Sequence, residues 1–293
     1  MTGLSRSIVA IIGISSQLGP ALVTALEDNN LDVVGLSRSP TTTARCPVHI
    51  FRDGASLPIP PLPPISALIS IAPLPAIVEV ARLANLIGVR RVIAFGSTGV
   101  FSKTASTADV ERQFVRDQLA AEQAFASLAV ANGFHWTLFR PTMIYGAGTD
   151  QNVTFIRSMI RRFRAFPIPL GAKGLRQPVH VEDLADACVK VLNNPATFNR
   201  AYNLGGGEVI EYAEMVRRIC RADGLPARLI SIPRTLYRWI VRAARRMPGL
   251  AYLNETMVDR MFTDLTTDHS DAERDFGYAP RKFQPPGRVS ANL

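Results

Sequence analysis

Residues 7–26 read SIVAIIGISSQLGPALVTAL, and this stretch decides the fold of the chain. The unbroken apolar run over residues 8–12 is typical of a strand that is buried on both faces of a parallel sheet. From Pro20 onward the apolar residues recur at helical spacing, and proline suits a first helical turn because its φ is fixed and it lacks an N–H. The stretch therefore predicts a buried strand, a turn and a helix.

The turn between these elements carries a glycine pattern, Gly13-x-x-Ser16-x-x-Gly19. It is a degraded form of the dinucleotide-binding fingerprint, with Ser16 where a glycine would allow the closest approach to phosphate. The N-terminus of the following helix presents unpaired N–H groups and the positive end of its dipole, which favours a pyrophosphate. An ordinary strand-to-helix turn is the alternative, but the order of strand, turn and helix favours nucleotide binding. The predicted contacts from the turn are Gly13, Ser15, Ser16, Gln17, Leu18 and Gly19.

The composition describes a globular protein. Of its 293 residues, 47% are hydrophobic and 19% are charged, so the chain can bury a substantial core. The net charge of +9 favours anionic partners, but no nucleic-acid motif accompanies it, so we expect a solvated basic surface and no nucleic-acid partner. The three cysteines lie far apart without metal-ligand spacing, which predicts free thiols in a reducing cytoplasm and no metal site. No apolar segment is long enough to span a bilayer, and the N-terminal apolar run is too short for a signal peptide.

Alternating strands and helices predict a doubly wound parallel α/β sheet, the Rossmann fold for NAD(P), over residues 1–148. Strands are expected at residues 8–12, 31–37, 48–51, 67–72, 91–95 and 136–140, and helices from residue 20 and at 76–87 and 110–132. Five prolines within residues 56–65 exclude a helix there. Residues 149–293 are less regular and predict a smaller C-terminal substrate lobe, with some segments returning to the sheet. Its expected elements are strands at 177–181 and 202–204 and helices at 153–163, 184–192, 212–223 and 234–247.

The residues that follow the predicted strands are candidates for the binding site, because ligands of parallel sheets lie at the carboxyl ends of the strands. Ser37 and Arg38 stand where an acidic residue would bind an adenosine ribose, which tilts the choice from NAD(H) toward NADP(H). A solvent-facing arginine is the alternative. Asp53 suits an adenine contact, and Ala72 ends the next strand. Ser97 and Thr98 are expected to face the same crevice as the glycine turn.

Seven segments occur in an order that resembles the extended short-chain dehydrogenase/reductase superfamily, specifically its NAD-dependent epimerase/dehydratase family. They are GISSQLG, RRVIAFGSTGVF, LAAEQAF, RPTMIYG, RQPVHVEDLADA, YNLGGGE and the terminal pattern around Asp268, Ala272, Phe276-Gly277-Tyr278 and Pro280. The resemblance covers almost the whole chain. It implies a bound dinucleotide, contacted also by Gln118 and Pro141, and an oxidoreductase or isomerase that acts on nucleotide-activated sugars.

The same resemblance implies a catalytic tyrosine whose pKa is lowered by a lysine four residues later, together with a serine or threonine that binds the same substrate oxygen. Here Phe114 stands at the tyrosine position and Gln118 at the lysine position. Phenylalanine has no titratable proton and glutamine has no charge, so the usual proton transfer cannot run. Ser97 and Thr98 remain as catalytic candidates, and Tyr145 is the nearest replacement acid/base, although an aromatic residue in this loop is more often a packing residue.

The resemblance and the sequence pattern also indicate roles for residues of the C-terminal part. Arg176 matches an arginine that contacts the substrate diphosphate, with a surface arginine as the alternative. His180 is expected to be a packed histidine on a strand, and Asp183 to be a helix cap. The helix at residues 234–247 carries five arginines opposite an apolar stripe. We expect this stripe to pack on the core, with contact to an anionic membrane surface as the alternative.

Two functions stay open from the sequence. The first is an atypical epimerase, dehydratase or reductase for a nucleotide- or lipid-linked sugar, which the Ser97-Thr98 loop and Arg176 favour. The second is a non-catalytic, nucleotide-binding subunit with a structural or regulatory role at a membrane surface, which Phe114 and Gln118 favour. A homodimer is compatible with the resemblance.

Overall fold

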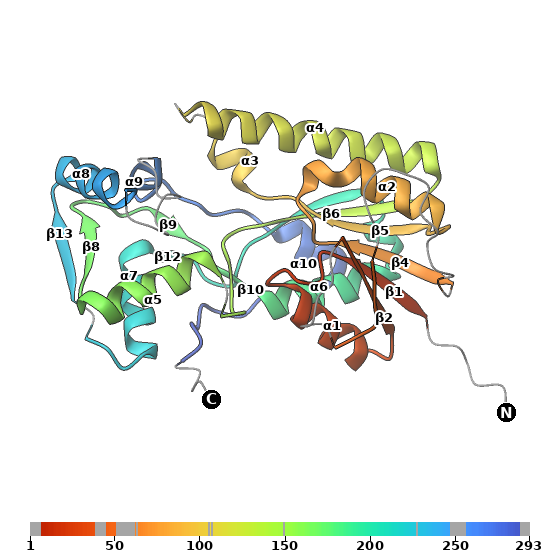
Figure 1. The fold of residues 1–293 in the computed structure, drawn as a ribbon, viewed down its shortest axis with the longest axis horizontal. Coiled ribbons are helices and arrows are strands. Elements are labelled where there is room, and N and C mark those ends of the chain that lie inside the picture. Colours follow the sequence, from red (N-terminus) through yellow and green to blue (C-terminus); the bar gives the residue numbers. More distant parts are fainter. Residues whose placement is uncertain are drawn as a thin grey trace.

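The computed structural model describes residues 7–38, 45–50, 62, 64–104, 106, 108–148, 150–226, 228–246 and 256–287. Within them, seven strands form a parallel sheet in the order β11-β6-β5-β4-β1-β2-β3. Figure 1 labels the central strands β6, β5, β4, β1 and β2. The strands are β1 (Ile8–Ile12), β2 (Asp32–Ser37), β3 (Val48–Ile50), β4 (Ile65–Ser70), β5 (Arg91–Phe95), β6 (His135–Pro141) and β11 (Arg200–Leu204). The strand order reverses beside β1, which pairs with both β2 and β4. The predicted doubly wound α/β fold is therefore confirmed.

Helices cover both faces of this sheet because successive strand residues point to opposite sides. Val9 and Ile11 pack with α1 (Gly19–Asp28), α6 (Val181–Leu192) and α10 (Ser270–Phe276). Ala10 and Ile12 pack with α2 (Ile77–Leu86) and α4 (Asp109–Asn132) on the other face. The apolar run that predicts β1 is thus explained by a strand with a core on each side.

A second group of elements lies beside the sheet, at the left of Figure 1. Its helices are α5 (Gln151–Phe163), α7 (Tyr212–Ala222), α8 (Arg234–Ala244) and α9 (Thr256–Arg260). Its strands form pairs, of which β8 (Phe166–Pro169) with β13 (Leu229–Ile232) is parallel and β9 (Leu175–Arg176) with β12 (Ile210–Glu211) is antiparallel. A further pair, β7 (Ile144–Tyr145) with β10 (Val179–His180), follows β6. A domain boundary near residue 148 stays a prediction.

Several elements differ from the expected ones. The loop after β5 contains a short helix, α3 (Gly99–Ser102), and a 3₁₀ turn, η1 (Leu74–Ala76), precedes α2. The strand expected at residues 177–181 is only β10, because helix α6 already begins at Val181. β11 pairs with β6 and so lies in the main sheet. Strands β8 and β13 and helices α9 and α10 were not expected.

The apolar stripe of helix α8 is largely exposed, so the expected packing of this stripe on the core is wrong. Trp239 is 65% exposed, Leu236 49% and Ile240 41%, while Tyr237 and Val241 fill the buried side of the helix. Among the helices of the described residues, none is long and apolar enough to cross a membrane.

Candidate functional site

The glycine turn, residues 13–19, joins β1 to α1 and needs both of its glycines. Gly13 has φ +83°, and a Cβ there would lie 3.1 Å from the backbone nitrogen of Ala72. A Cβ on Gly19 would lie 1.8 Å from the carbonyl oxygen of Ile14. Backbone hydrogen bonds from Ser16 N to Gly13 O (2.9 Å) and from Gly19 N to Ser16 O (3.0 Å) close the turn. The turn therefore lies tightly against the end of β4, where Ala72 follows.

The first turn of α1 offers unsatisfied donors to an anion. Its N-cap residue, Leu18, provides no side-chain cap, and no acidic residue occupies the first turn. Beside it, the hydroxyl oxygen of Ser16 is buried and makes no hydrogen bond within the described part of the chain. A buried polar atom without a partner is costly, so a ligand oxygen or phosphate at this place is a good match for the turn.

The other predicted cofactor contacts lie around the strand ends. Ser37 is the last residue of β2, next to β1, and Arg38 follows it with an exposed side chain. Gln118 lies on α4 and is 7% exposed, and its side-chain oxygen also makes no hydrogen bond to the described residues. Pro141 ends β6. Asp53 lies outside the described residues.

Ser97 and Thr98 have different surroundings after β5. The hydroxyl of Thr98 donates to the carbonyl oxygen of Pro141 (3.1 Å), which ties the loop after β5 to the end of β6. The hydroxyl oxygen of Ser97 accepts a hydrogen bond from Gly99 N (3.0 Å). Because this bond uses only an acceptor site, the hydroxyl hydrogen of Ser97 can still be donated to a substrate oxygen.

Three side chains meet above Gly99. A Cβ on Gly99 would lie 3.1 Å from Ser97 Oγ, 3.1 Å from Phe114 Cε1 and 3.6 Å from Lys103 Cε. The ammonium nitrogen of Lys103 is 4.0 Å from the centroid of the Phe114 ring. Phe114 and Ser97 thus approach the same point above Gly99, and Gln118 follows Phe114 one helical turn later on α4. The ring provides an apolar wall and no group that can transfer a proton.

Tyr145 lies in a packing environment. Its side chain is fully buried, its ring contacts His180 and Phe283 edge-on, and its hydroxyl accepts a hydrogen bond from Gln284 N (3.2 Å). Burial raises the pKa of this hydroxyl above its ordinary value. The geometry therefore does not support the predicted acid/base role of Tyr145.

Arg176 is similarly enclosed, with 5% of its surface exposed. Its guanidinium donates to the carbonyl oxygens of Leu175 (2.6 Å), Thr263 (3.0 Å) and Arg260 (2.7 Å), and it stacks on the ring of Tyr212. Burial lowers the pKa of Arg176 to about 10. These contacts bind α9 to β9, so the geometry does not support contact with a substrate diphosphate.

The prediction that Asp183 caps a helix is wrong. Helix α6 begins at Val181, and His180 is its N-cap, with Nδ1 accepting from Glu182 N (3.3 Å). Asp183 instead accepts from Arg281 N (3.1 Å) and from its guanidinium (2.7 Å). The expected packing role of His180 agrees with its edge-on contact with Tyr145.

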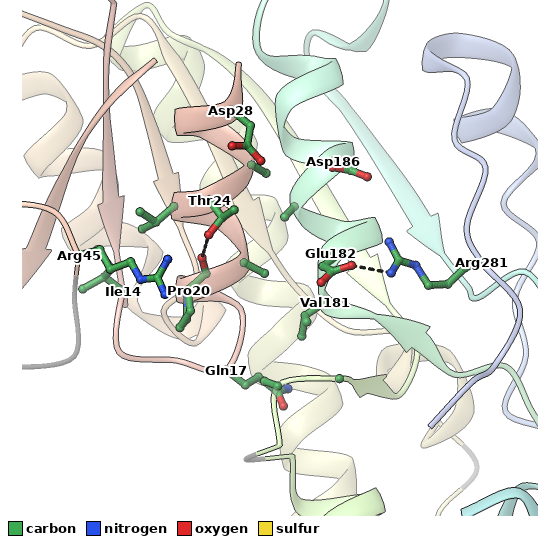
Figure 2. A pocket seen from close by; sticks show the side chains of 16 residues that line it. Ile14, Gln17, Pro20, Thr24, Asp28, Arg45, Val181, Glu182, Asp186 and Arg281 are labelled. Atoms are coloured by element: carbon green, nitrogen blue, oxygen red, sulfur yellow. Dashed lines mark hydrogen bonds and ion pairs between the residues drawn. The ribbon is translucent and has the colours of Figure 1, made fainter. Parts of the chain in front are cut away.

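A cavity of about 520 Å³ lies between α1 and α6 (Figure 2). Gln17 and Ile14 of the glycine turn line it, and Figure 2 shows Arg45, Asp28, Asp186 and the Glu182–Arg281 ion pair around it. The cavity lies on the sheet face covered by α1 and α6, whereas Phe114 and Gln118 come from α4 on the other face. It therefore adjoins the glycine turn but does not include Ser97.

Sequence reasoning missed Lys103, Glu111 and Arg260. Lys103 is one of only four lysines in the chain, and this scarcity is the one signal that could have marked it. Glu111 is buried and forms an ion pair with Arg260 (2.7 Å). No spacing in the sequence links Arg260 to α4, because tertiary packing brings them together. All three cysteines are free thiols, and the described residues contain no cluster of side chains that could hold a metal ion.

Comparison with known proteins extends these observations. Residues 75–205 match the model of the NAD-dependent epimerase/dehydratase family. The UDP-glucose 4-epimerase of Vibrio cholerae is 24% identical over 212 residues, which cover 69% of this chain and 62% of the relative. The chain thus spans less than two thirds of the length of this curated relative.

Solved structures share the fold over nearly the whole chain. MoeE5, in complex with UDP-glucuronic acid and NAD, is 20% identical with a TM-score of 0.68, and the match covers 94% of this chain and 95% of that one. UDP-N-acetylglucosamine 4-epimerase from Bacillus cereus is 13% identical with a TM-score of 0.69, and the match covers 95% of each chain. At these identities the likeness establishes the fold.

Proposed function

We propose that the chain, whose residues 75–205 match the model of the NAD-dependent epimerase/dehydratase family, binds NAD(H) or NADP(H) along the glycine turn. The observation that carries the proposal is the turn itself, in which Gly13 and Gly19 tolerate no side chain and the buried Ser16 hydroxyl has no partner among the described residues. The uncapped N-terminus of α1 would bind the pyrophosphate, and Gln118 would meet the far end of the cofactor.

We propose NADP(H) ahead of NAD(H). Ser37 and Arg38 follow β2 where an acidic residue would favour the ribose hydroxyls of NAD. A guanidinium there suits a 2′-phosphate. Replacing Arg38 by aspartate should therefore shift the preference toward NAD(H).

The proposed activity is an atypical epimerase, dehydratase or reductase for a nucleotide- or lipid-linked sugar. Relatives that bind or convert UDP-sugars support this substrate class. The dinucleotide, when bound, would supply hydride transfer. Ser97 would orient a sugar hydroxyl through its free O–H, and the Phe114 ring would exclude water from that oxygen. Neither side chain is a base at neutral pH.

A non-catalytic, nucleotide-binding subunit is the second candidate. Phe114 and Gln118 at the tyrosine and lysine positions favour it, as do the enclosed side chains of Tyr145 and Arg176. The two candidates are separated by assaying wild type and Phe114→Tyr/Gln118→Lys with UDP-glucose and each cofactor. Turnover by wild type supports the enzyme, and turnover by the double variant alone supports a subunit that kept its pocket. Activity in neither protein, with cofactor binding intact, would contradict a sugar-nucleotide enzyme.

We further propose that helix α8 contacts an anionic lipid surface. Its exposed apolar residues Leu236, Trp239 and Ile240 share the helix with arginines, a pattern typical of helices that lie in the membrane interface. A homodimer and a cytoplasmic location complete the proposal. Free thiols support the location, and sedimentation velocity tests the dimer.

A further inference from the structure

The ammonium nitrogen of Lys103 lies 4.0 Å from the centroid of the ring of Phe114, the residue at the tyrosine position. Lys103 directly follows α3, and its backbone nitrogen donates to Gly99 O (3.1 Å), so the short helix fixes where its side chain starts. Its Cε, the Phe114 ring edge and Ser97 Oγ all lie within 3.6 Å of one point, which is the position that a Cβ added to Gly99 would take. Lys103 and Ser97 therefore border the same space above Gly99.

We propose that Lys103 is the acid/base of this site, its neutral amine accepting the proton of a sugar hydroxyl held by Ser97 and its ammonium returning that proton in the reverse direction. The inference rests on the proposed function. In the forward step the substrate O–H bond breaks and an N–H bond forms on Nζ. The electron pair of the O–H bond stays on the substrate oxygen, and the lysine becomes cationic. The oxygen electron pair then closes the C=O bond as the C–H bond of the same carbon breaks, and the oxidised nicotinamide dinucleotide of the proposed function would accept that hydride.

The groups that the described residues place around Lys103 leave its amine able to take up and release a proton, because none of them holds it in an ion pair. From α4 it faces the Phe114 ring and Glu111, and from α9 it faces Arg260. Glu111 is already engaged, since it accepts hydrogen bonds from Arg260 (2.7 Å) and Thr256 (3.1 Å). Lys103 forms no ion pair with any carboxylate of the described residues.

This environment also acts on the protonation equilibrium of the amine. Burial lowers the pKa of Lys103 below its ordinary value, the positive charge of Arg260 lowers it further, and Glu111 opposes both. A lowered pKa increases the fraction of neutral amine near neutral pH, as a general base requires. Phe114 complements this role, because its face attracts the ammonium form without donating or accepting a proton.

The scarcity of lysine allows a test that does not depend on turnover. The four lysines, Lys103, Lys173, Lys190 and Lys282, can be labelled with trace acetic anhydride across a pH series and quantified by peptide mass spectrometry. We expect Lys103 to reach half-maximal reactivity at a lower pH than the exposed Lys173 and Lys282. UDP-glucose together with NADP should protect Lys103 several-fold and leave the two references unchanged. If the reactivity of Lys103 follows that of Lys173 and Lys282 across the pH series, and UDP-glucose with NADP gives no protection, the inference is overturned.

A set of variants tests the proton transfer itself. Lys103→Met keeps an apolar stem over the ring, and Lys103→Arg keeps the charge but cannot release a proton at neutral pH. Both should lower kcat about 100-fold or more, leave cofactor affinity within a factor of about three, and abolish the rise of kcat with pH that deprotonation of the Lys103 ammonium gives. Lys173→Met is the matched control. Wild-type turnover that survives in Lys103→Met would refute the role of Lys103.

The outcomes distinguish this inference from the proposed function. If wild type does not bind the cofactor, both the proposed function and the role of Lys103 are contradicted. Intact cofactor binding with full activity in Lys103→Met removes only the lysine role. Absence of wild-type turnover, together with no protection of Lys103 by UDP-glucose and NADP, would overturn the lysine role.

Discussion

The Cα of Gly19 faces the carbonyl oxygen of Ile14 so closely that an added Cβ would lie 1.8 Å from that oxygen. The contact is between backbone atoms of the glycine turn, so no side chain can move to relieve it. Gly19→Ala should therefore open the turn, lower the free energy of unfolding by roughly 2–3 kcal/mol and abolish dinucleotide binding.

Gly88→Ala is the control for this variant. Gly88 has φ +72° but has nothing within 4 Å of an added Cβ. Gly88→Ala should lower the free energy of unfolding only by the conformational strain of a positive φ, about 1 kcal/mol. Urea unfolding measures the free energy of unfolding of both variants. A Gly19→Ala variant as stable as Gly88→Ala would contradict the close backbone contact between Gly19 and Ile14.

Arg176 gives a prediction that separates a structural role from a substrate contact. Arg176→Ala leaves the carbonyl oxygens of Leu175, Thr263 and Arg260 without their shared donor. We expect the free energy of unfolding to fall by about 2–4 kcal/mol. The exposed Arg217→Ala should change it by less than about 0.5 kcal/mol. A raised KM for a sugar nucleotide with unchanged stability would assign Arg176 to the substrate instead.

His180 predicts a pH dependence of stability. Burial and Arg281 lower the pKa of His180 from its ordinary value of 6.5, while Glu182 and Asp183 oppose them. The unfolded chain therefore takes up a proton at a higher pH than the folded chain, so this group removes stability as pH falls below 6.5 toward the folded pKa. Protonation also removes the Nδ1 acceptor that caps α6.

The variant His180→Asn keeps a capping acceptor and does not titrate. Between about pH 7.5 and about pH 5, it should lose less stability in urea unfolding than wild type does. The exposed His135→Asn is the matched control and should behave like wild type. An equal loss in His180→Asn and wild type would exclude His180 as the source.

Helix α8 predicts selective binding to anionic vesicles. Wild type should bind phosphatidylglycerol vesicles and not phosphatidylcholine vesicles in a sedimentation assay. Trp239→Ala should weaken this binding about tenfold, because the exposed indole is the largest apolar group on the helix. Phe163→Ala, which removes an exposed aromatic ring from α5, should have little effect. Equal binding to both lipids would contradict a basic, interfacial helix.

The central sheet could be predicted because its strands are buried on both faces. Such strands appear as continuous apolar runs, and β1 and β5 begin and end at the expected residues. The strands of the second group could not be predicted in the same way. β7, β9, β10 and β12 have two residues each, so no periodicity can develop. Their pairing depends on segments that are distant in sequence.

In the candidate site, too, the local pattern could be predicted and the contacts between distant segments could not. The glycine turn is local, and its order of strand, turn and helix was sufficient to find it. The turn of α3 brings Lys103 and Ser97 to the same point above Gly99, and Arg260 reaches Glu111 from a separate part of the chain. Tyr145 was a candidate because it follows a sheet strand. Its segment forms β7, which pairs with β10, and its side chain is buried against Phe283, with the hydroxyl accepting from Gln284 N.

Equilibrium titration with NADPH and NADH, followed by nicotinamide fluorescence, tests most directly whether a dinucleotide lies along the glycine turn. Wild type and the surface control Ser127→Ala should give the same saturable signal. Ser16→Ala should bind about tenfold more weakly with unchanged stability, because the Ser16 hydroxyl has no partner to lose among the described residues. A wild-type protein that shows no saturable signal with either nucleotide would contradict the account.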